Sequence, residues 1–233
     1  MMNGEGYKDE IIAICMPAQD THPMKFTLAL AMQLFELGRD GYTKILVIPG
    51  HSSVGAFRAR NRIMKIISEV ERERGWKVDW TFWVDSDMLF PSRAYQALRG
   101  HNKEIVGATY RRRSEPFELL GRPLEGTSGK VTIGNLAPSA RLPTGLMLIK
   151  RSVFDRFKMP VWKVELGEDG VEDVLGEDGL FCAEALELGH EIWLDTQLTM
   201  LCKHIAVTEL AAEADKAPQP QIIMPPGLIE ARV

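Results

Sequence analysis

Apolar runs alternate with amphipathic stretches over the first half of the chain. The runs at 10–16, 44–50 and 78–84 are rich in β-branched and aromatic residues, which is typical of strands buried on both faces of a sheet. Between them, apolar residues recur with a helical period and predict helices at 24–37 and from the loop after residue 50 to about residue 74. We therefore expect an α/β fold with an open, mixed, mostly parallel sheet and helices on both faces.

The second half of the chain has a less regular pattern. A fourth strand is expected at 104–110, and the Gly-, Pro-, Ser- and Arg-rich residues 111–140 indicate a long functional loop. The remaining expected elements are a strand and a short helix at 143–157, a helix at 178–188, and strands at 191–195 and 198–206. We place one domain at 1–208 and an extended, Pro-rich C-terminal tail at 209–233.

Bulk properties exclude several classes of protein. The 233 residues, 45% of them hydrophobic, suffice for one sizeable core. The net charge of −4 gives no overall attraction to nucleic acid, so a nucleic-acid acceptor would depend on local basic patches. The three scattered cysteines indicate free thiols in a reducing compartment. No apolar run is long enough to span a membrane and no signal-peptide pattern is present, so we expect a cytoplasmic protein.

Two carboxylates, Asp85 and Asp87, directly follow the third apolar run. Side chains at i and i+2 of an extended segment point to the same side, and like charges at a buried strand end need a cation or a proton. A divalent metal ion that also binds phosphate oxygens meets this need. A plain Asp-Ser-Asp turn is the alternative, and the spacing alone does not decide between them. Ligands of open α/β sheets bind beyond the carboxyl ends of the strands, where this turn lies.

Two further residues combine charge with an apolar setting. Arg60 lies at the margin of the apolar face of its helix, near the N-terminal end, which suits contact with a diphosphate or a nucleobase. An arginine with a buried stem and its charged group in water is the alternative. His204 follows Leu198, Met200 and Cys202 with a period of two, which predicts that it shares their face of a strand. It is either a metal ligand or a hydrogen-bonded core residue.

An ordered set of motifs resembles the GT-A-type glycosyltransferases, and more narrowly the small family-2-like members that phages and prophages often encode. The motifs are Arg60-Asn61-Arg62, WTFWVDSDMLFP (80–91), EIVGATYRRR (104–113), LPTGLMLIKRSVFDRF (142–157) and GEDGLFCAEALELGHEIWLD (176–195), followed by His204. Their order and spacing extend over residues 9–206. The resemblance implies a GT-A-like, Rossmann-like fold and a hexosyltransferase activity.

The resemblance also assigns the donor side of a site. The donor would be a nucleotide-diphosphate sugar, UDP- or GDP-linked, and the turn after the first strand would hold its nucleotide: Pro17, Ala18, Gln19 and Asp20. Asp85 would lie nearer the ribose or sugar and Asp87 would bind the metal ion directly, the two acting as one pair. His204 would be the third ligand, and its imidazole would favour Mn²⁺ over Mg²⁺.

The acceptor side is assigned in the same way. Asp178, with Glu177 as the second choice, would be the general base that activates the hydroxyl of the acceptor. Gly145 would allow close approach of the backbone in the sugar and acceptor pocket. Trp162 would either stack on the acceptor or pack in the core. Two other functions stay open, a sugar-nucleotide nucleotidyltransferase and a non-catalytic nucleotide- or carbohydrate-binding protein of the same fold.

Overall fold

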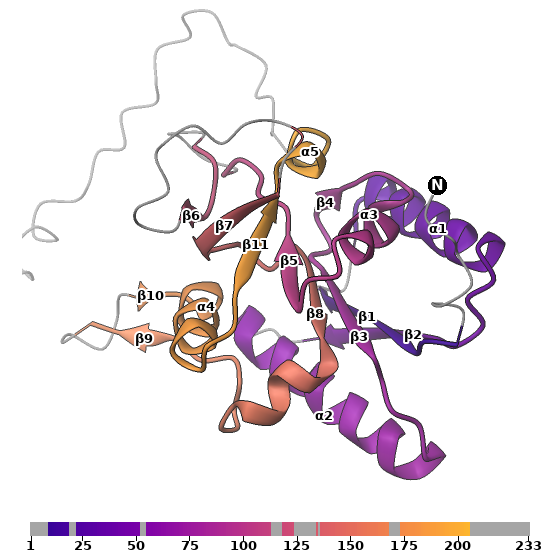
Figure 1. The fold of residues 1–233 in the computed structure, drawn as a ribbon, viewed down its shortest axis with the longest axis horizontal. Helices are drawn as coiled ribbons and strands as arrows, with labels where there is room; N and C mark the ends of the chain where they lie inside the picture. The colour runs from indigo at the N-terminus through magenta and orange to yellow at the C-terminus, as the bar shows by residue number, and fades with distance from the viewer. Residues whose placement is uncertain are drawn as a thin grey trace, which may run out of the picture.

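An eight-stranded sheet forms the centre of the molecule, in the order β2-β1-β3-β8-β5-β11-β7-β6 (Figure 1). The computed structural model describes residues 9–18, 22–51, 55–112, 118–123, 134, 136–167 and 173–205. The strands of the sheet are β1 (Ile12–Ala18), β2 (Ile45–His51), β3 (Trp80–Val84), β5 (Ile105–Gly107), β6 (Arg122–Pro123), β7 (Leu136–Arg141), β8 (Leu146–Lys150) and β11 (Ile192–Asp195). Gln19, Asp20 and the tail expected at 209–233 lie outside the described residues.

The strands run mostly in one direction. β1 is parallel to β2 and β3, and β11 is parallel to β5, whereas β8 lies antiparallel between β3 and β5. β7 is antiparallel to both β11 and β6. The expected α/β class, with an open, mixed, mostly parallel sheet, is confirmed.

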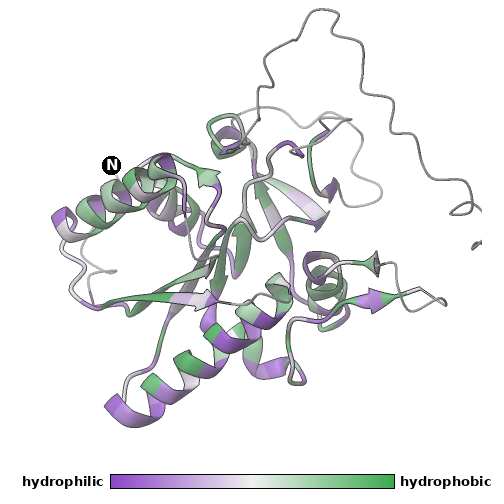
Figure 2. Cartoon of the chain, turned by 180° about the vertical axis from the view of Figure 1, so that it is seen from behind, coloured by the Kyte–Doolittle hydropathy of each residue, from purple (hydrophilic) through white to green (hydrophobic). Residues whose placement is uncertain are grey.

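Helices cover both faces of this sheet, as expected (Figure 1). One face packs against α1 (Met24–Arg39) and α3 (Ala94–Gly100), and the other against α2 (Ala56–Arg74), the 3-10 helix η1 (Arg151–Arg156) and α4 (Glu177–Glu187). β1 shows how the sequence builds two cores: Ile12, Ile14 and Met16 enter one, and Ala13 and Cys15 enter the other. In Figure 2 hydrophobic strands lie between helices that carry both hydrophilic and hydrophobic residues.

The strand predicted at 44–50 is present as β2, but the prediction that it is buried is wrong. β2 pairs only with β1 and lies at the edge of the sheet, and Val47 is 41% exposed. A run of Ile, Leu and Val cannot by itself distinguish an edge strand from a central one, because that difference depends on which strands pair.

Two other stretches also differ from the expected pattern. β7 covers Leu136–Arg141, whereas within 111–140 the sequence predicts only a short strand at KVTIGN (130–135) in a long loop. Residues 198–206 do not form one strand: α5 (Thr196–Thr199) comes first because the Asp195 carboxylate caps it, accepting a hydrogen bond from Leu198 N at 2.7 Å. Only β12 (Lys203–His204) is extended, and His204 therefore does not share a strand face with Leu198.

Short pairings complete the described structure. β12 pairs antiparallel with β4 (Met88–Leu89), and β9 (Glu165–Leu166) pairs antiparallel with β10 (Asp173–Leu175). No helix in the described part of the chain is both long and apolar enough to cross a membrane.

Candidate functional site

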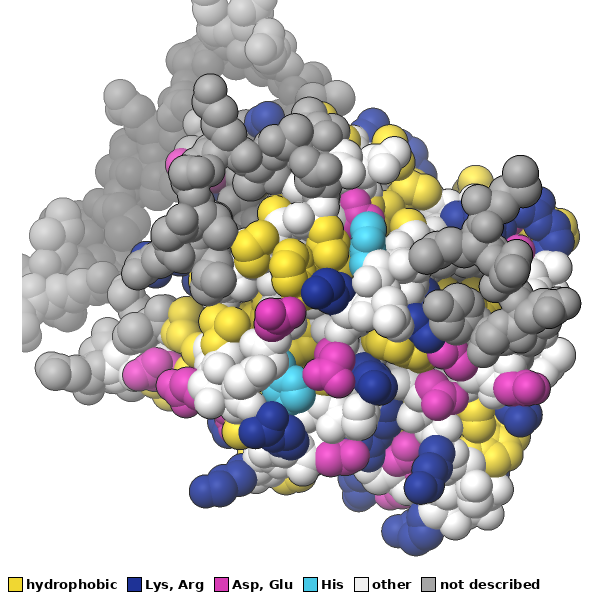
Figure 3. Space-filling view, viewed as in Figure 1, with side chains coloured by type: hydrophobic (Ala, Val, Ile, Leu, Met, Phe, Trp, Pro, Cys, Tyr) yellow, Lys and Arg dark blue, Asp and Glu magenta, His cyan; other side chains and the backbone are white. Residues whose placement is uncertain are grey.

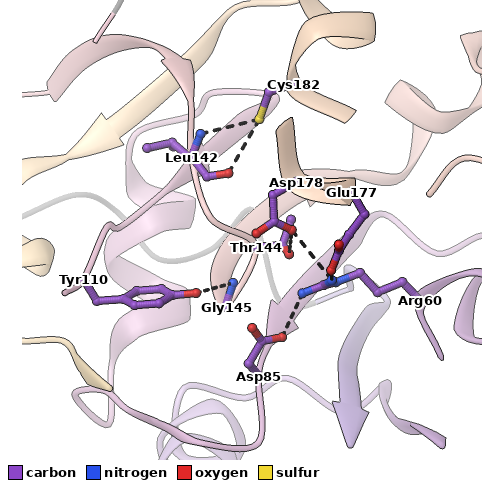
Figure 4. Close-up of polar contacts among 9 residues, drawn as sticks. All are labelled: Arg60, Asp85, Tyr110, Leu142, Thr144, Gly145, Glu177, Asp178 and Cys182. Atoms are coloured by element: carbon purple, nitrogen blue, oxygen red, sulfur yellow. Dashed lines mark hydrogen bonds and ion pairs between the residues drawn. The ribbon is translucent and has the colours of Figure 1, made fainter. Parts of the chain in front are cut away.

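A buried arginine joins three parts of the chain at the edge where β3 ends. The Arg60 side chain, on α2, is 2% exposed. Its Nη2 donates a hydrogen bond to Asp85 Oδ1 at 3.0 Å and its Nη1 donates to Glu177 Oε1. Asp178 Oδ1 lies 3.7 Å from the same Nη1 (Figure 4). One guanidinium therefore connects α2, the end of β3 and the start of α4.

Negative charge exceeds positive charge in this cluster. Burial raises the pKa of Asp85 to about 6; Arg60 acts against this shift, and the charges of Asp178, Asp87 and Glu177 add to it. Burial disfavours the charged form of Arg60, but the three carboxylates around it raise its pKa above the ordinary value. Three acids share one buried guanidinium and Asp87 adds its charge to Asp85, so the site favours an additional cation or a proton.

The pairing of β8 with β3 brings Gly145 beside Asp85. Val84 lies opposite Leu146, and Asp85 N donates a hydrogen bond to Gly145 O at 3.1 Å. Gly145 N in turn donates to the Tyr110 hydroxyl oxygen at 3.0 Å (Figure 4). A Cβ atom on Gly145 would lie 2.7 Å from Tyr110 Cζ and 2.9 Å from Asp85 Oδ2, so only glycine fits without displacement.

Asp178 is the more open of the two acids at the start of α4. Its side chain is 32% exposed, against 21% for Glu177, whose Oε1 accepts a hydrogen bond from Arg60. Thr144 Oγ1 donates a hydrogen bond to Asp178 Oδ1 at 2.5 Å and fixes the carboxylate (Figure 4). Both acids line a pocket of about 210 Å³, whose other walls include Leu120, Arg141, Leu142 and Pro143. Asp178 is thus held in place while part of it faces open space.

Asp87 and His204 face each other across the small β4–β12 sheet. His204 pairs with Met88, Ile205 N donates a hydrogen bond to Asp87 O at 2.7 Å, and His204 Nε2 lies 3.4 Å from Asp87 Oδ1. The Tyr110 ring packs edge-on against the imidazole. A carboxylate oxygen beside an imidazole nitrogen is a donor pair that fits Mn²⁺. Asp85 is turned to Arg60 instead, and no three His, Cys, Asp or Glu side chains of the described residues gather as around a metal ion.

The turn expected to hold the nucleotide is only partly described. Pro17 and Ala18 end β1, which is parallel to β3, so they lie at the same edge of the sheet as Asp85. Gln19 and Asp20 are beyond the described residues.

Trp162 belongs to the core, so the interpretation that it stacks on an acceptor is wrong. It is 1% exposed and its ring stacks on Phe181 with 4.7 Å between centroids. The Arg60 guanidinium lies 5.6 Å from the centre of the indole. Asn61 Nδ2 donates to Trp162 O at 2.7 Å, and Trp162 N donates to Asn61 Oδ1 at 3.1 Å. The Asn61 amide therefore fixes the indole on which Arg60 lies.

Several residues of the site were not predicted as such. They are Asn61, Tyr110, Arg141 and Thr144. Asn61 directly follows the predicted residue Arg60, and Thr144 directly precedes the predicted residue Gly145. Their position next to a predicted residue could have identified both. Nothing local to Tyr110 or Arg141 predicts their positions.

Charges of both signs are interspersed over the face of the molecule seen in Figure 3. Lys and Arg side chains alternate there with Asp and Glu, and the described residues of that face do not form one continuous basic surface. This face therefore gives no electrostatic support for a nucleic-acid acceptor.

No known protein-family model matches the sequence, and no curated protein matches it. Among solved structures, A197 from STIV has a TM-score of 0.54 at 10% identity, covering 87% of this chain and 97% of A197. At that identity the likeness shows a shared fold and nothing further.

Two other solved structures have TM-scores below 0.5. The nucleoside-diphosphate-sugar pyrophosphorylase from Vibrio cholerae RC9 has a TM-score of 0.44 at 11% identity, covering 82% of this chain and 94% of that one. GalNAc-T7 with UDP, GalNAc and Mn²⁺ has a TM-score of 0.43 at 13% identity, covering 93% of this chain and 40% of that one. Likenesses this distant carry no argument about function.

Proposed function

We propose that this chain is a metal-dependent glycosyltransferase that transfers a hexose from a UDP- or GDP-linked sugar to a hydroxyl acceptor. The observation that carries the proposal is the Arg60 cluster, which joins Asp85 on the donor side to Glu177 and Asp178 on the acceptor side. The ordered GT-A-type motifs over residues 9–206 give independent support.

On the donor side, Asp87 and His204 are the residues assigned to Mn²⁺, with Asp85 beside them. A bound Mn²⁺ would offset the negative charge that develops on the diphosphate leaving group. Pro17 and Ala18, at the end of the neighbouring strand β1, are assigned to the nucleotide together with Gln19 and Asp20. We assign Arg60 to holding Asp85 in place, because its guanidinium is already bound to carboxylates.

On the acceptor side, Asp178 acts as the general base. The acceptor oxygen forms a bond to the anomeric carbon while the bond from that carbon to the diphosphate breaks, and the hydroxyl proton passes to the Asp178 carboxylate. Thr144 and Arg60 orient this carboxylate, and its partial exposure leaves it accessible from the pocket. This role applies if the anomeric centre is inverted; with retention, Asp178 would position the sugar instead.

A donor screen tests the proposal. Hydrolysis of a panel of UDP-, GDP- and other nucleotide sugars is followed with Mn²⁺ and with EDTA. We expect turnover of one donor that disappears in EDTA and in Asp87→Ala, with Asp155→Ala, an exposed carboxylate of η1, as the control. Asp178→Asn should slow transfer to an added acceptor by about 10²- to 10⁴-fold, the usual contribution of a general base.

Three results would contradict the proposal. No hydrolysis of any nucleotide sugar, together with no Mn²⁺-dependent nucleotide binding, would contradict both the donor and the metal assignment. Release of pyrophosphate from a nucleoside triphosphate and a sugar 1-phosphate would indicate a nucleotidyltransferase instead. Nucleotide binding with no turnover of any donor would indicate a non-catalytic binding protein.

A further inference from the structure

The pocket beside Asp178 has walls of unlike chemistry. Glu177 and Asp178 form one side, and Leu120, Leu142 and Pro143 give apolar surface. Glycines at 121, 176 and 179 complete the lining. The volume of about 210 Å³ is below the roughly 300–1,000 Å³ of pockets that take drug-sized ligands, so the space suits a single small unit.

Arg141 is the cationic side chain of this pocket. It lies at the end of β7 and is exposed, and no described acidic residue forms an ion pair with it. Its stem packs on the first turn of α4, because Arg141 Cδ lies 3.3 Å from where a Cβ on Gly179 would be. Arg141 therefore places a guanidinium, which is available for a ligand, near the start of the helix that carries Asp178.

The first turn of α4 also lines this pocket. Gly176 occupies the N-cap and has no side chain to accept the first N–H groups of the helix. The two acids of the first turn line the same pocket, where Glu177 accepts a hydrogen bond from Arg60 and Asp178 accepts one from Thr144. An anion at the Arg141 end of the pocket would thus pair with its guanidinium.

The wall between these groups is fixed in place. Leu142 N lies 3.5 Å from Cys182 Sγ, and Cys182 Sγ lies 3.6 Å from Leu142 O, so α4 is tied to the segment that follows Arg141 (Figure 4). Burial raises the pKa of the Cys182 thiol to about 12, which keeps it protonated in this contact. The spacing between Arg141 and Asp178 is therefore set by the fold.

We propose that this pocket binds the acceptor and selects a hydroxyl compound that carries an anionic group. Arg141 binds the anion, a carboxylate or a phosphate on a single sugar unit, and a hydroxyl of the same unit lies at Asp178. The inference rests on the proposed function, since it takes Asp178 as the base. An arginine pairs with either anion through two parallel N–H donors, which also orients the sugar.

Calorimetric titration with matched glycosides tests this assignment in the full chain. The pairs are the methyl glycosides of glucose and glucuronate, of galactose and galacturonate, and methyl glucoside with its 6-phosphate. We expect at least one anionic member to bind tenfold or more tightly than its neutral partner. Arg141→Gln should reduce that ratio to within twofold, whereas Arg156→Gln, at an exposed residue of η1, should preserve it. The glucuronate and galacturonate pairs test a carboxylate and the 6-phosphate pair tests a phosphate, so the comparison identifies which anion is preferred.

Three outcomes would overturn the inference: equal binding of neutral and anionic members, a preference that survives Arg141→Gln, or no binding of any anionic glycoside. Donor hydrolysis with Mn²⁺ is measured separately, so the two proposals fail in different ways. Metal-dependent hydrolysis without an anionic preference overturns the pocket assignment alone. Arg141-dependent anion binding without turnover of any nucleotide sugar overturns the proposed function alone.

Discussion

Gly145 is the residue where β8, Tyr110 and Asp85 come closest together. Its backbone conformation is open to other residues, so what restricts the position is space and not φ. Gly145→Ala should lower the free energy of unfolding by about 1–3 kcal/mol, the usual cost of overpacking, and impair the site because Asp85 must move. Urea denaturation measures the change.

Two further substitutions separate the steric clash at Gly145 from a general effect of replacing glycine by alanine. Tyr110→Phe removes the oxygen nearest the added methyl group, so Gly145→Ala combined with Tyr110→Phe should be less destabilised than the sum of the two single variants. Gly100→Ala, where a Cβ meets nothing within 4 Å, should stay within about 0.5 kcal/mol of wild type. Equal effects at Gly100 and Gly145 would contradict the steric explanation.

The Asp85 carboxyl gives the molecule a stability that depends on pH. Because its pKa is about 6 in the folded protein and about 4 in an unfolded chain, folding takes up a proton between these values. The stabilisation is present at the acid end and is lost as the pH rises through 6. Relative to Asp85→Asn, which does not titrate, wild type should lose up to about 3 kcal/mol of unfolding free energy between pH 4 and pH 6. A difference that stays constant in urea denaturation across this range would show that Asp85 titrates normally.

At the scale of elements, the sequence predicts what depends on local pattern. The apolar runs and helical periods located β1, α1, α2, β3 and α4 within a few residues, because each buries a face or a stripe that repeats along the chain. The edge position of β2 and the antiparallel insertion of β8 depend on pairing between distant strands, which no local pattern contains. The helical turn α5 replaced a predicted strand because one carboxylate, Asp195, caps it.

In the candidate site, too, the sequence predicts single residues but not the contacts between distant ones. Asp85 could be singled out because it stands at the end of a strand, and Asp178 because the resemblance assigns it to the acceptor side. Their connection through Arg60 could not be predicted, because Arg60 and Glu177 are 117 residues apart in the chain. Arg60 was expected either to contact a ligand or to keep its charged group in water; its guanidinium is buried and contacts three carboxylates.

Asn61 is the link between elements that is most open to test. Its amide binds both backbone groups of Trp162 and so ties α2 to the segment that precedes β9. Asn61→Ala should lower the free energy of unfolding by about 2–3 kcal/mol, since two buried backbone groups lose their partner. It should also lower metal-dependent donor hydrolysis, because the indole under Arg60 is no longer fixed.

The matched control for Asn61 lies on the same helix. Ser68 donates only to Met64 O within α2, so Ser68→Ala should change stability by no more than about 0.5 kcal/mol. A small effect of Asn61→Ala, comparable to that of Ser68→Ala, would mean that Trp162 is held by ring stacking alone.

At the scale of the whole molecule, the sheet separates two hydrophobic cores and places the acids where neither core covers them. Asp85 and Asp87 leave β3 at its carboxyl end, and Glu177 and Asp178 reach the same place from the far part of the chain. Folding therefore brings together like charges that are far apart in the unfolded chain. A cation that binds only the folded state should oppose this repulsion and stabilise the entire fold.

This coupling predicts the effect of Mn²⁺ on thermal unfolding. At 100 times its dissociation constant, a ligand of the folded state adds about 2.7 kcal/mol, which for a chain of this size raises Tm by roughly 5–10 °C. We expect that rise in differential scanning calorimetry, its reversal by EDTA, and its loss in Asp87→Ala and in His204→Ala, because their side chains face each other at 3.4 Å. Asp155→Ala, remote from the cluster on η1, should keep the full rise. An Mn²⁺ effect that survives in both Asp87→Ala and His204→Ala would place the cation elsewhere among the acids, and no effect in wild type would remove the metal from this site.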